Sequence, residues 1–247
     1  MISDVHVHTN FCDGKHSPEE MVLSAIEKGV DRLGLLVHAS LWFSSWSIKP
    51  ERAKEFAIEM KKLKEKYKGK IELLCGAELD YYSEMDLDGY DYTIGSVHYF
   101  SSNGKFYAID HSEEAFVNSV KNGFNGDYYA AAENYFETLS GYATKHNPDI
   151  IGHFDLVRKF NLGNKYFDET HPRYVTAATK AVEKLIPLGV PFEINTGAIS
   201  RGYQDNPYPS AWAIDLIKSK GGKLIINSDS HNKDTIAFQF DKWSSLI

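Results

Sequence analysis

The chain has 247 residues, of which 43% are hydrophobic and 25% are charged, and its formal net charge is -7 at pH 7. This length supports one sizeable core, so we expect a single domain over residues 1–247. The acidic balance disfavours extended nucleic-acid binding, because no general basic surface is available for a phosphate backbone. No apolar run approaches the roughly 20 residues of a membrane span, and residues 1–8 lack the basic start and apolar stretch of a signal peptide. We therefore expect a cytoplasmic protein without a membrane partner, whose oligomeric state the sequence leaves open.

Seven short runs along the chain have the length and composition of β-strands. In chain order they cover residues 2–8, 32–38, 71–79, 92–99, 150–156, 191–196 and 223–228. Helical spacing occurs between most of them, at residues 50–67, 128–145, 172–188 and 209–220, and Ser17, Pro18 and Glu20 mark a capped helix start. This alternation predicts an α/β fold of parallel βα units, and seven such units favour a closed or nearly closed barrel.

Residues 101–127 do not fit this alternation. They are rich in Gly, Asn and Ser, and they lie where an ordinary βα connection would be much shorter. Long connections inside compact domains are usually functional, so we expect this segment to be a lid or a binding insertion.

Histidines and acids recur at the C-terminal ends of the predicted strands. The residues at or just after these ends are His6, His8, His38, Glu78, His98, His153, Asn195, Asp229 and His231. In a parallel barrel these ends lie on one face, where the catalytic groups of such barrels gather. A single histidine at a strand end is more often a hydrogen-bonded core or rim residue, but that explanation would have to hold at several ends at once. We therefore predict a metal site on this face.

The spacing of these residues suits metal binding. His6 and His8 are separated by one residue, so both rings should point to the same side of a strand, and Asp4 should point there too. Because one carboxylate can bridge two ions and an imidazole cannot, Glu78 is the expected bridge. His16 lies in a loop, where the pattern does not distinguish a metal ligand from an ordinary polar residue.

These residues belong to short motifs that follow one another along nearly the whole chain. The motifs are DVHVHT (4–9), FCDGKH (11–16), His38, GAE (76–78), GSVH (95–98), GH (152–153) and SDSH (228–231). In this order they resemble the PHP (polymerase and histidinol phosphatase) superfamily. The segments EINTG (193–197) and GHFDL (152–156) are more similar to its histidinol-phosphatase branch than to its polymerase-associated branch.

The resemblance implies a distorted (β/α)7 barrel with about three divalent ions of zinc, iron or manganese at the C-terminal ends of the strands. The first ion would be held by His6, His8, Glu78 and Asp229. The second would be held by His16, His38 and His231, and the third by Glu78, His98 and His153. The chain ends at Ile247, soon after His231, where a covering helix is usual in the family. We therefore expect the seam of the barrel to be incompletely closed.

A cluster of divalent ions attracts a dianionic phosphate, and closely spaced ions can lower the pKa of a bound water to about 7. The resemblance therefore implies hydrolysis of a small phosphate monoester. Its histidinol-phosphatase branch implies the conversion of L-histidinol phosphate to L-histidinol and phosphate in histidine biosynthesis. The alternatives are a phosphodiesterase or a phosphoprotein (tyrosine) phosphatase that uses the same cluster, and a non-enzymatic metal-binding module. No ligand position is missing, which disfavours the last alternative.

Catalytic and substrate-binding side chains are expected on the same face. We assign catalytic roles to Glu78, Asp229, His231 and Arg201. Arg158 and Arg201 follow predicted strands and can clamp phosphate oxygens, with a salt bridge elsewhere as the alternative for each. Asn195 ends a strand, and Trp42 can stack on an imidazole-bearing substrate or pack in a rim loop. These four residues form the expected substrate site.

Overall fold

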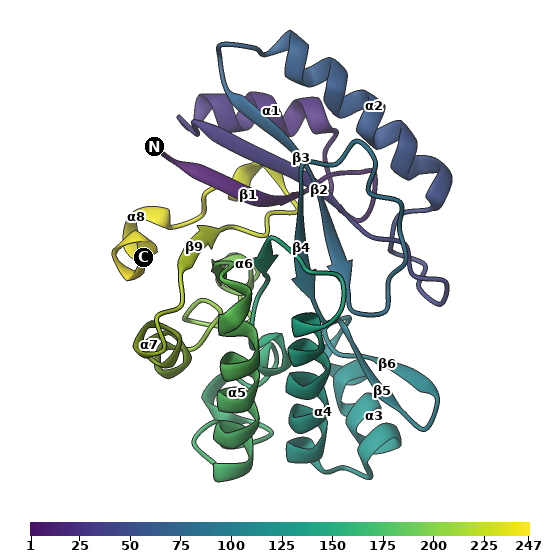
Figure 1. The fold of residues 1–247 in the computed structure, drawn as a ribbon, viewed down its shortest axis with the longest axis vertical. Coiled ribbons are helices and arrows are strands. Elements are labelled where there is room, and N and C mark those ends of the chain that lie inside the picture. The colour runs from purple at the N-terminus through teal and green to yellow at the C-terminus, as the bar shows by residue number, and fades with distance from the viewer.

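A seven-stranded parallel sheet forms the centre of the computed structural model, which describes residues 1–247 (Figure 1). Its strands follow the order β1-β2-β3-β4-β7-β8-β9. They are β1 (Ser3–His8), β2 (Arg32–His38), β3 (Glu72–Asp80), β4 (Tyr92–Ser96), β7 (Ile150–Ile151), β8 (Phe192–Asn195) and β9 (Leu224–Asn227). All seven predicted strands are confirmed. Only β7 is much shorter than predicted, because the chain leaves the sheet after Ile151 and forms a 3-10 turn at Leu156–Arg158.

The sheet curves into a nearly closed barrel, and its seam lies between β9 and β1. The main chain bridges the seam just after β9, where His8 N donates to Ser230 O at 2.8 Å and Ser230 N donates to His6 O at 3.2 Å. A side chain extends this contact, because Asn227 Oδ1 accepts a hydrogen bond from Val5 N at 2.8 Å. The end strands β1 and β9 form no ladder, and an isolated main-chain bridge joins the two sides of the seam. The expectation of an incompletely closed seam is therefore confirmed, and polar side chains cover the gap.

Asp4 is a buried carboxylate that ties this seam to the C-terminal segment. Its Oδ1 accepts from Ser228 N at 3.0 Å, and its Oδ2 accepts from Ser228 Oγ at 2.5 Å and from Ala237 N at 2.9 Å. The prediction that Asp4 points with the two β1 histidines was wrong. Directly after Asp4 the pairing of β1 with β2 is irregular, and an extra residue in β1 changes which side chains share a face.

Helices cover the outside of the barrel. They are α1 (Pro18–Glu27), α2 (Pro50–Lys66), α4 (Tyr128–Ser140), α5 (Pro172–Leu185) and α7 (Ala211–Ser219), with the short α6 (Gly197–Ser200) after β8 and α8 (Phe240–Trp243) after β9. The start of α1 is as predicted, since Ser17 Oγ accepts from Glu20 N at 3.4 Å and the Glu20 carboxylate accepts from Ser17 N at 2.9 Å. Between β3 and β4 the chain forms a loop without a helix, so the βα repeat is irregular there.

The predicted insertion, residues 101–127, folds into a hairpin followed by a helix. Strand β5 (Tyr99–Ser102) pairs antiparallel with β6 (Lys105–Ala108), and α3 (Glu113–Phe124) follows; these elements lie beside α4 (Figure 1). Asn134 of α4 exchanges hydrogen bonds of 3.2 and 3.1 Å with the main chain of Ser101. Ile109 N donates to His98 O at 2.9 Å, which brings the end of the hairpin to the C-terminal face of the barrel. A role as lid or binding segment stays a prediction.

Apolar side chains fill the barrel below the polar C-terminal face. Val5, Leu36, Ile94 and Ile150, from four different strands, form one buried cluster. On either side of Leu36 in β2, Leu35 and Val37 belong to a larger cluster with residues of α1 and α2 on the outside of the barrel. Because side chains alternate along a strand, Leu36 faces the inside. A further cluster includes residues of α4 and α5. No helix is long and apolar enough to cross a bilayer.

Replacing Asp4 with alanine should weaken the seam. The change leaves the buried N–H groups of Ser228 and Ala237 without their acceptor, and such unpaired groups cost about 1 to 3 kcal/mol. We expect the free energy of unfolding in urea to fall by about that amount, measured on metal-free protein so that ion binding does not contribute. Asp241→Ala, at an exposed position of α8, is the matched control. Equal unfolding free energies for the two variants would contradict this role of Asp4.

Candidate metal centre

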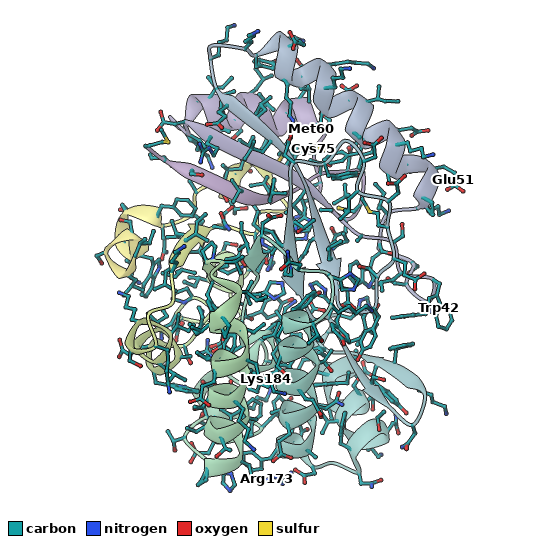
Figure 2. The ribbon with its side chains drawn as sticks, in the orientation of Figure 1. Trp42, Glu51, Met60, Cys75, Arg173 and Lys184 are labelled. Carbon is teal, nitrogen blue, oxygen red and sulfur yellow. The ribbon has the colours of Figure 1, made fainter.

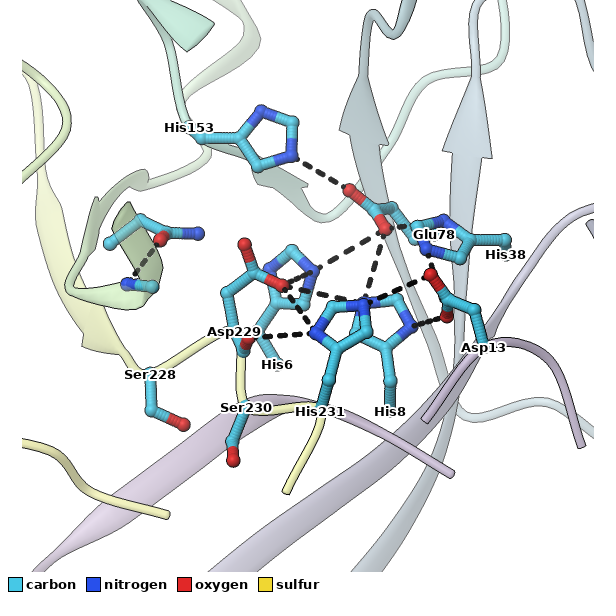
Figure 3. A network of polar contacts seen from close by, with 12 residues as sticks. His6, His8, Asp13, His38, Glu78, His153, Ser228, Asp229, Ser230 and His231 are labelled. Atoms are coloured by element: carbon cyan, nitrogen blue, oxygen red, sulfur yellow. Dashed lines mark hydrogen bonds and ion pairs between the residues drawn. The ribbon is translucent and has the colours of Figure 1, made fainter. Parts of the chain in front are cut away.

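The carboxylate of Glu78, on β3, lies among histidine rings at the C-terminal ends of the strands, and Figure 3 shows it between His153 and His38. Its side chain is 1% exposed, and His38 of β2 is its direct neighbour in the sheet register. Glu78 Oε2 lies 3.4 Å from His6 Nε2, 3.4 Å from His8 Nε2 and 2.9 Å from His38 Nδ1. Glu78 Oε1 lies 3.4 Å from His98 Nε2 and 3.0 Å from His153 Nε2. Imidazoles at the ends of β1, β2, β4 and β7 therefore surround one buried carboxylate.

Side-chain nitrogen and oxygen atoms on this face form three groups that could each hold a metal ion. Within each group the atoms lie within 4.8 Å of one another. The groups are His6, His8 and Asp229; His38, Glu78 and His98; and His8, Asp13, His38 and His231. The groups share members, and Glu78 contacts residues of all three. Such overlap is what a centre with several adjacent ions requires.

Several buried polar atoms of this centre have no hydrogen-bond partner within the protein. They include His6 Nε2, His8 Nε2 and Glu78 Oε2, which lie close to one another. Buried polar groups are normally paired, because an unpaired group costs free energy. A divalent cation would satisfy the nitrogen lone pairs and the carboxylate charge together. Imidazole and carboxylate ligands suit zinc, iron and manganese, so the residues fit the expected ions.

The charges of the centre keep its carboxylates ionised. Burial raises the pKa of Glu78, but positive charge on His6 and His98 outweighs this and holds the pKa well below its usual range. Burial lowers the pKa of His38, but the carboxylates of Asp13 and Glu78 raise it to about 9. The acids are therefore available as anionic ligands at neutral pH.

Glu193 of β8 lies behind the centre and orients it. Its buried carboxylate lies 2.6 Å from His6 Nδ1 and accepts hydrogen bonds from His153 N, Asn195 Nδ2 and Asn227 Nδ2, each at 2.9 Å. The contact at Nδ1 fixes the His6 ring so that Nε2 faces Glu78 and Asp229. We did not predict this residue. The available signal was an acid inside an otherwise apolar strand, which burial tolerates only with partners.

The loop after β1 places Asp13 in the ligand groups and leaves His16 outside them. Asp13 Oδ1 lies 3.4 Å from His38 Nε2, and its Oδ2 lies 3.3 Å from His231 Nε2. His16 Nδ1 instead accepts a hydrogen bond from Lys233 N at 3.3 Å, and His16 belongs to none of the three groups. This arrangement differs from the ligand set that the resemblance implied for the second ion.

A tight turn explains the position of Asp13. The main-chain N–H groups of Cys12 and Gly14 both donate to Thr9 O, at 3.1 and 3.0 Å. A Cβ atom at Gly14 would lie 2.7 Å from Thr9 N, so only glycine allows this approach. The turn brings the side chain of Asp13 back over the end of β1, and spacing in the sequence does not reveal this fold of the loop.

The two arginines of the expected substrate site have different surroundings. Arg201 lies over the metal centre, where its Nη1 donates to Asp229 O and its Nη2 to Asp229 Oδ2, both at 3.0 Å. Arg158 is buried elsewhere: its Nε donates to Glu169 at 3.0 Å and its Nη2 to Gln204 Oε1 at 3.2 Å. The structure therefore brings Arg201 to the site and does not bring Arg158 there.

Asn195 and Trp42 are also placed away from the substrate side of the centre. Asn195 is fully buried, and its amide is used by the Glu193 carboxylate and by Gly197 N, at 2.9 Å each. Trp42 is 85% exposed and lies at the edge of the molecule (Figure 2). Trp46, from the same loop, faces the centre instead, with its ring centroid 4.4 Å from that of His38.

A cavity of about 410 Å³ opens above the metal centre. Residues of the three ligand groups and His153 form its floor. Its wall comes from the loop after β2, from residues 99–111 (the hairpin segment, which holds β5 and β6) and from the turns after β7 and β8. The wall residues are Ser45, Trp46, Tyr99, Ala108, Asp110, His111, Leu156, Lys159 and Arg201. The volume falls within the range of about 300 to 1,000 Å³ that is typical of small-molecule sites.

The fold is a nearly closed parallel barrel, and overlapping groups of imidazoles and carboxylates lie on its C-terminal face. These two features place the chain in the class of metal-binding barrel proteins. The PHP domain family model matches residues 4–197, which is most of the chain. The chain therefore belongs to the PHP domain family, as its motifs suggested.

The chain is similar to several proteins over nearly its full length. The chain is 24% identical over 263 residues to the histidinol-phosphatase of Bacillus subtilis (strain 168), with 96% of each chain covered. A crystal structure from Listeria monocytogenes, provisionally assigned as a histidinol phosphatase, matches with a TM-score of 0.86 and 22% identity, covering 98% of this chain and 99% of that one. Histidinol phosphate phosphatase from Lactococcus lactis, complexed with zinc, L-histidinol and phosphate, matches with a TM-score of 0.69 and 21% identity, covering 100% and 92%. These structures establish the shared fold.

Replacing Glu193 with glutamine should weaken metal binding. The amide cannot supply the negative charge that now faces His6 Nδ1, and loss of such an outer partner typically costs about 10- to 100-fold in metal affinity. We expect lower metal content after dialysis against a chelator of known affinity, measured by elemental analysis. Glu183→Gln, at an exposed pair with Lys220, is the control. Wild-type metal content in the Glu193 variant would contradict the orienting role.

The variants Asp13→Asn and His16→Gln distinguish the two possible ligand sets. If Asp13 is a ligand, its amide variant should bind fewer ions per chain, because a neutral amide is a much weaker ligand than a carboxylate. His16→Gln should keep the wild-type metal content. The measurement is the number of ions per chain by elemental analysis. The opposite pattern would restore His16 to the ligand set and contradict the position of Asp13.

Proposed function

We propose that the chain is a metal-dependent phosphate monoesterase that converts L-histidinol phosphate to L-histidinol and phosphate. The observation that carries the proposal is the Glu78 carboxylate, surrounded by imidazoles on the floor of a small-molecule cavity. Its relatives include named histidinol phosphatases over nearly their full length, and one of them was crystallised with zinc, L-histidinol and phosphate. The proposed reaction belongs to histidine biosynthesis.

The same proposal includes about three divalent ions. His6, His8, Glu78 and Asp229 would hold the first, His38 and His231 with Asp13 the second, and Glu78, His98 and His153 the third. Bound there, such ions neutralise a phosphate dianion and lower the pKa of water so that hydroxide is available at neutral pH. The zinc in the Lactococcus lactis structure supports a divalent metal.

Side chains of the protein would orient the phosphate. Arg201 holds Asp229 through one edge of its guanidinium, and this contact fixes the side chain in the cavity wall beside the metal centre. A guanidinium has five N–H donors, so others remain for phosphate oxygens. Asp229 is held in a left-handed backbone conformation with φ 51°, which is uncommon for a residue other than glycine and is frequent at functional sites. We therefore assign phosphate binding to Arg201 and ion positioning to Asp229, Glu78 and His231.

The size of the cavity favours a small substrate over a polymer. Residues of the hairpin segment and of the loop that carries Trp46 form its wall, and the volume is about 410 Å³. The net charge of -7 also disfavours an extended nucleic acid. Both observations favour a monoester of a small alcohol over a phosphodiester chain.

Purified protein should hydrolyse L-histidinol phosphate and, more slowly, p-nitrophenyl phosphate, and a chelator should abolish both activities because the ions leave the centre. A dinucleotide diester should not be cleaved at a comparable rate. Phosphate release measures the first two reactions, and chromatography measures the third. Cleavage of the diester alone would contradict the monoesterase proposal.

Glu78→Gln tests the role of the central carboxylate in the same assays. The amide has no negative charge to share between ions, so both metal content and turnover should fall, the latter by at least about 100-fold. Glu72→Gln, at the exposed start of the same strand, is the matched control. Full activity of the Glu78 variant would overturn its bridging role.

A further inference from the structure

The wall of the cavity contains one carboxylate that the metal centre does not use. Asp13, Glu78 and Asp229 line the cavity as members of the ligand groups, whereas Asp110 lines it and belongs to none of them. Asp110 lies between β6 and α3, at the end of the hairpin segment. Its side chain is 28% exposed, so it is partly covered by the cavity wall.

The position of Asp110 is fixed by contacts on both sides. Lys159 Nζ donates to Asp110 O at 2.7 Å and approaches Asp110 Oδ2 at 3.4 Å. The ammonium of Lys159 also lies 4.9 Å from the ring centroid of Tyr203, which holds the lysine in place. The preceding residue, Ile109, is buried and donates its N–H to His98 O. The Asp110 carboxylate therefore has a defined place relative to the metal centre.

A carboxylate on this wall is unfavourable for binding a phosphate alone. Like charges repel, and the repulsion is stronger in a partly desolvated cavity than in water. The Lys159 ammonium, which lines the same wall and pairs with Asp110 Oδ2 at 3.4 Å, offsets this repulsion without removing the charge of the carboxylate. Burial raises the pKa of Asp110, but the positive charges of Lys159 and His98 outweigh this effect. The pKa is therefore below its usual value, and the side chain is charged at neutral pH. The carboxylate becomes favourable when the substrate carries a cation on the part that is not phosphate.

Aromatic side chains on the same wall suit such a substrate. The rings of Trp46 and Tyr99 are parallel within 4°, and Trp46 Nε1 donates to the Tyr99 hydroxyl at 2.7 Å. Aromatic faces bind ammonium groups and planar rings. The wall thus combines a fixed anion with aromatic surface, while the floor provides the phosphate site.

We propose that Asp110 is a specificity-determining residue that binds the ammonium group of the leaving alcohol, so that the enzyme selects phosphate monoesters of amino alcohols. The inference rests on the proposed function and deepens it, because L-histidinol phosphate is such an ester. Asp110 takes no part in bond breaking. It forms an ion pair with the substrate ammonium, while Lys159 keeps its hydrogen bond to the main-chain oxygen of Asp110 and its contact with Oδ2.

The test compares two substrates that differ only in the amino group: L-histidinol phosphate and the imidazolyl-propyl phosphate that lacks it. Asp110→Asn keeps the size of the side chain and the main-chain contact of Lys159. In metal-loaded enzyme, kcat/KM for L-histidinol phosphate should fall by about 10- to 100-fold, the range expected for losing a hydrogen bond to a charged group. The amine-free ester should change by less than about 3-fold, because it makes no such bond.

Asp215→Asn, at an exposed position of α7, is the matched control, and metal content is measured for every variant. An equal loss for both esters, or no loss for either, would overturn the role of Asp110 and leave the phosphatase proposal standing. A wild-type enzyme that hydrolyses neither ester would contradict the proposed function itself, and the inference with it. A selective loss for the amine-bearing ester confirms Asp110 as the ammonium site.

Discussion

The structure depends on one constraint, which is the burial of the Glu78 carboxylate among five imidazole rings. An isolated buried carboxylate is strongly unfavourable, so it must be compensated by hydrogen bonds, by opposite charge or by metal ions. Here the compensating side chains come from the ends of four other strands. They can reach one carboxylate only if the sheet curves into a barrel, so the fold and the metal centre require each other.

A second layer of polar groups makes this arrangement rigid. Glu193 binds His6 and the main chain of His153, which brings the first strand and the segment after β7 to one anchor. Asp4 binds the chain after β9 and holds the seam on the other side. Neither carboxylate can contact a substrate, since both are fully buried. Their contribution is to hold the ligand side chains in one geometry, so that binding ions requires little rearrangement.

The features that the sequence predicted correctly follow from periodicity. Seven strands and the gathering of their C-terminal ends required only the alternation of apolar runs and the rule that parallel strand ends share a face. Asp13 was not predicted as a ligand, and the direction of Asp4 was predicted wrongly, because their positions depend on a tight turn at Gly14 and on an extra residue in β1. Arg158 and Arg201 both follow strands, so the sequence does not distinguish them. In the tertiary structure Arg158 pairs with Glu169 away from the site, whereas Arg201 pairs with Asp229 at the site. Local spacing predicts which residues can meet, whereas loops and irregular pairing decide which of them do.

The two ends of the cavity have different origins. The floor is made by strand ends and belongs to the barrel that the PHP family shares. The wall is made by the hairpin segment and by loops, which vary more readily without loss of the core. Phosphate chemistry would then reside in the floor, and the choice of leaving group in the wall.

Anomalous diffraction from crystals of the metal-loaded protein, collected at the absorption edge of the bound metal, shows whether Glu78 contacts the bound ions. We expect strong anomalous peaks on both sides of the Glu78 carboxylate, one within bonding distance of Oε1 and one within bonding distance of Oε2. A single peak that Glu78 does not contact, or peaks confined to another part of the surface, would contradict the bridging role of Glu78.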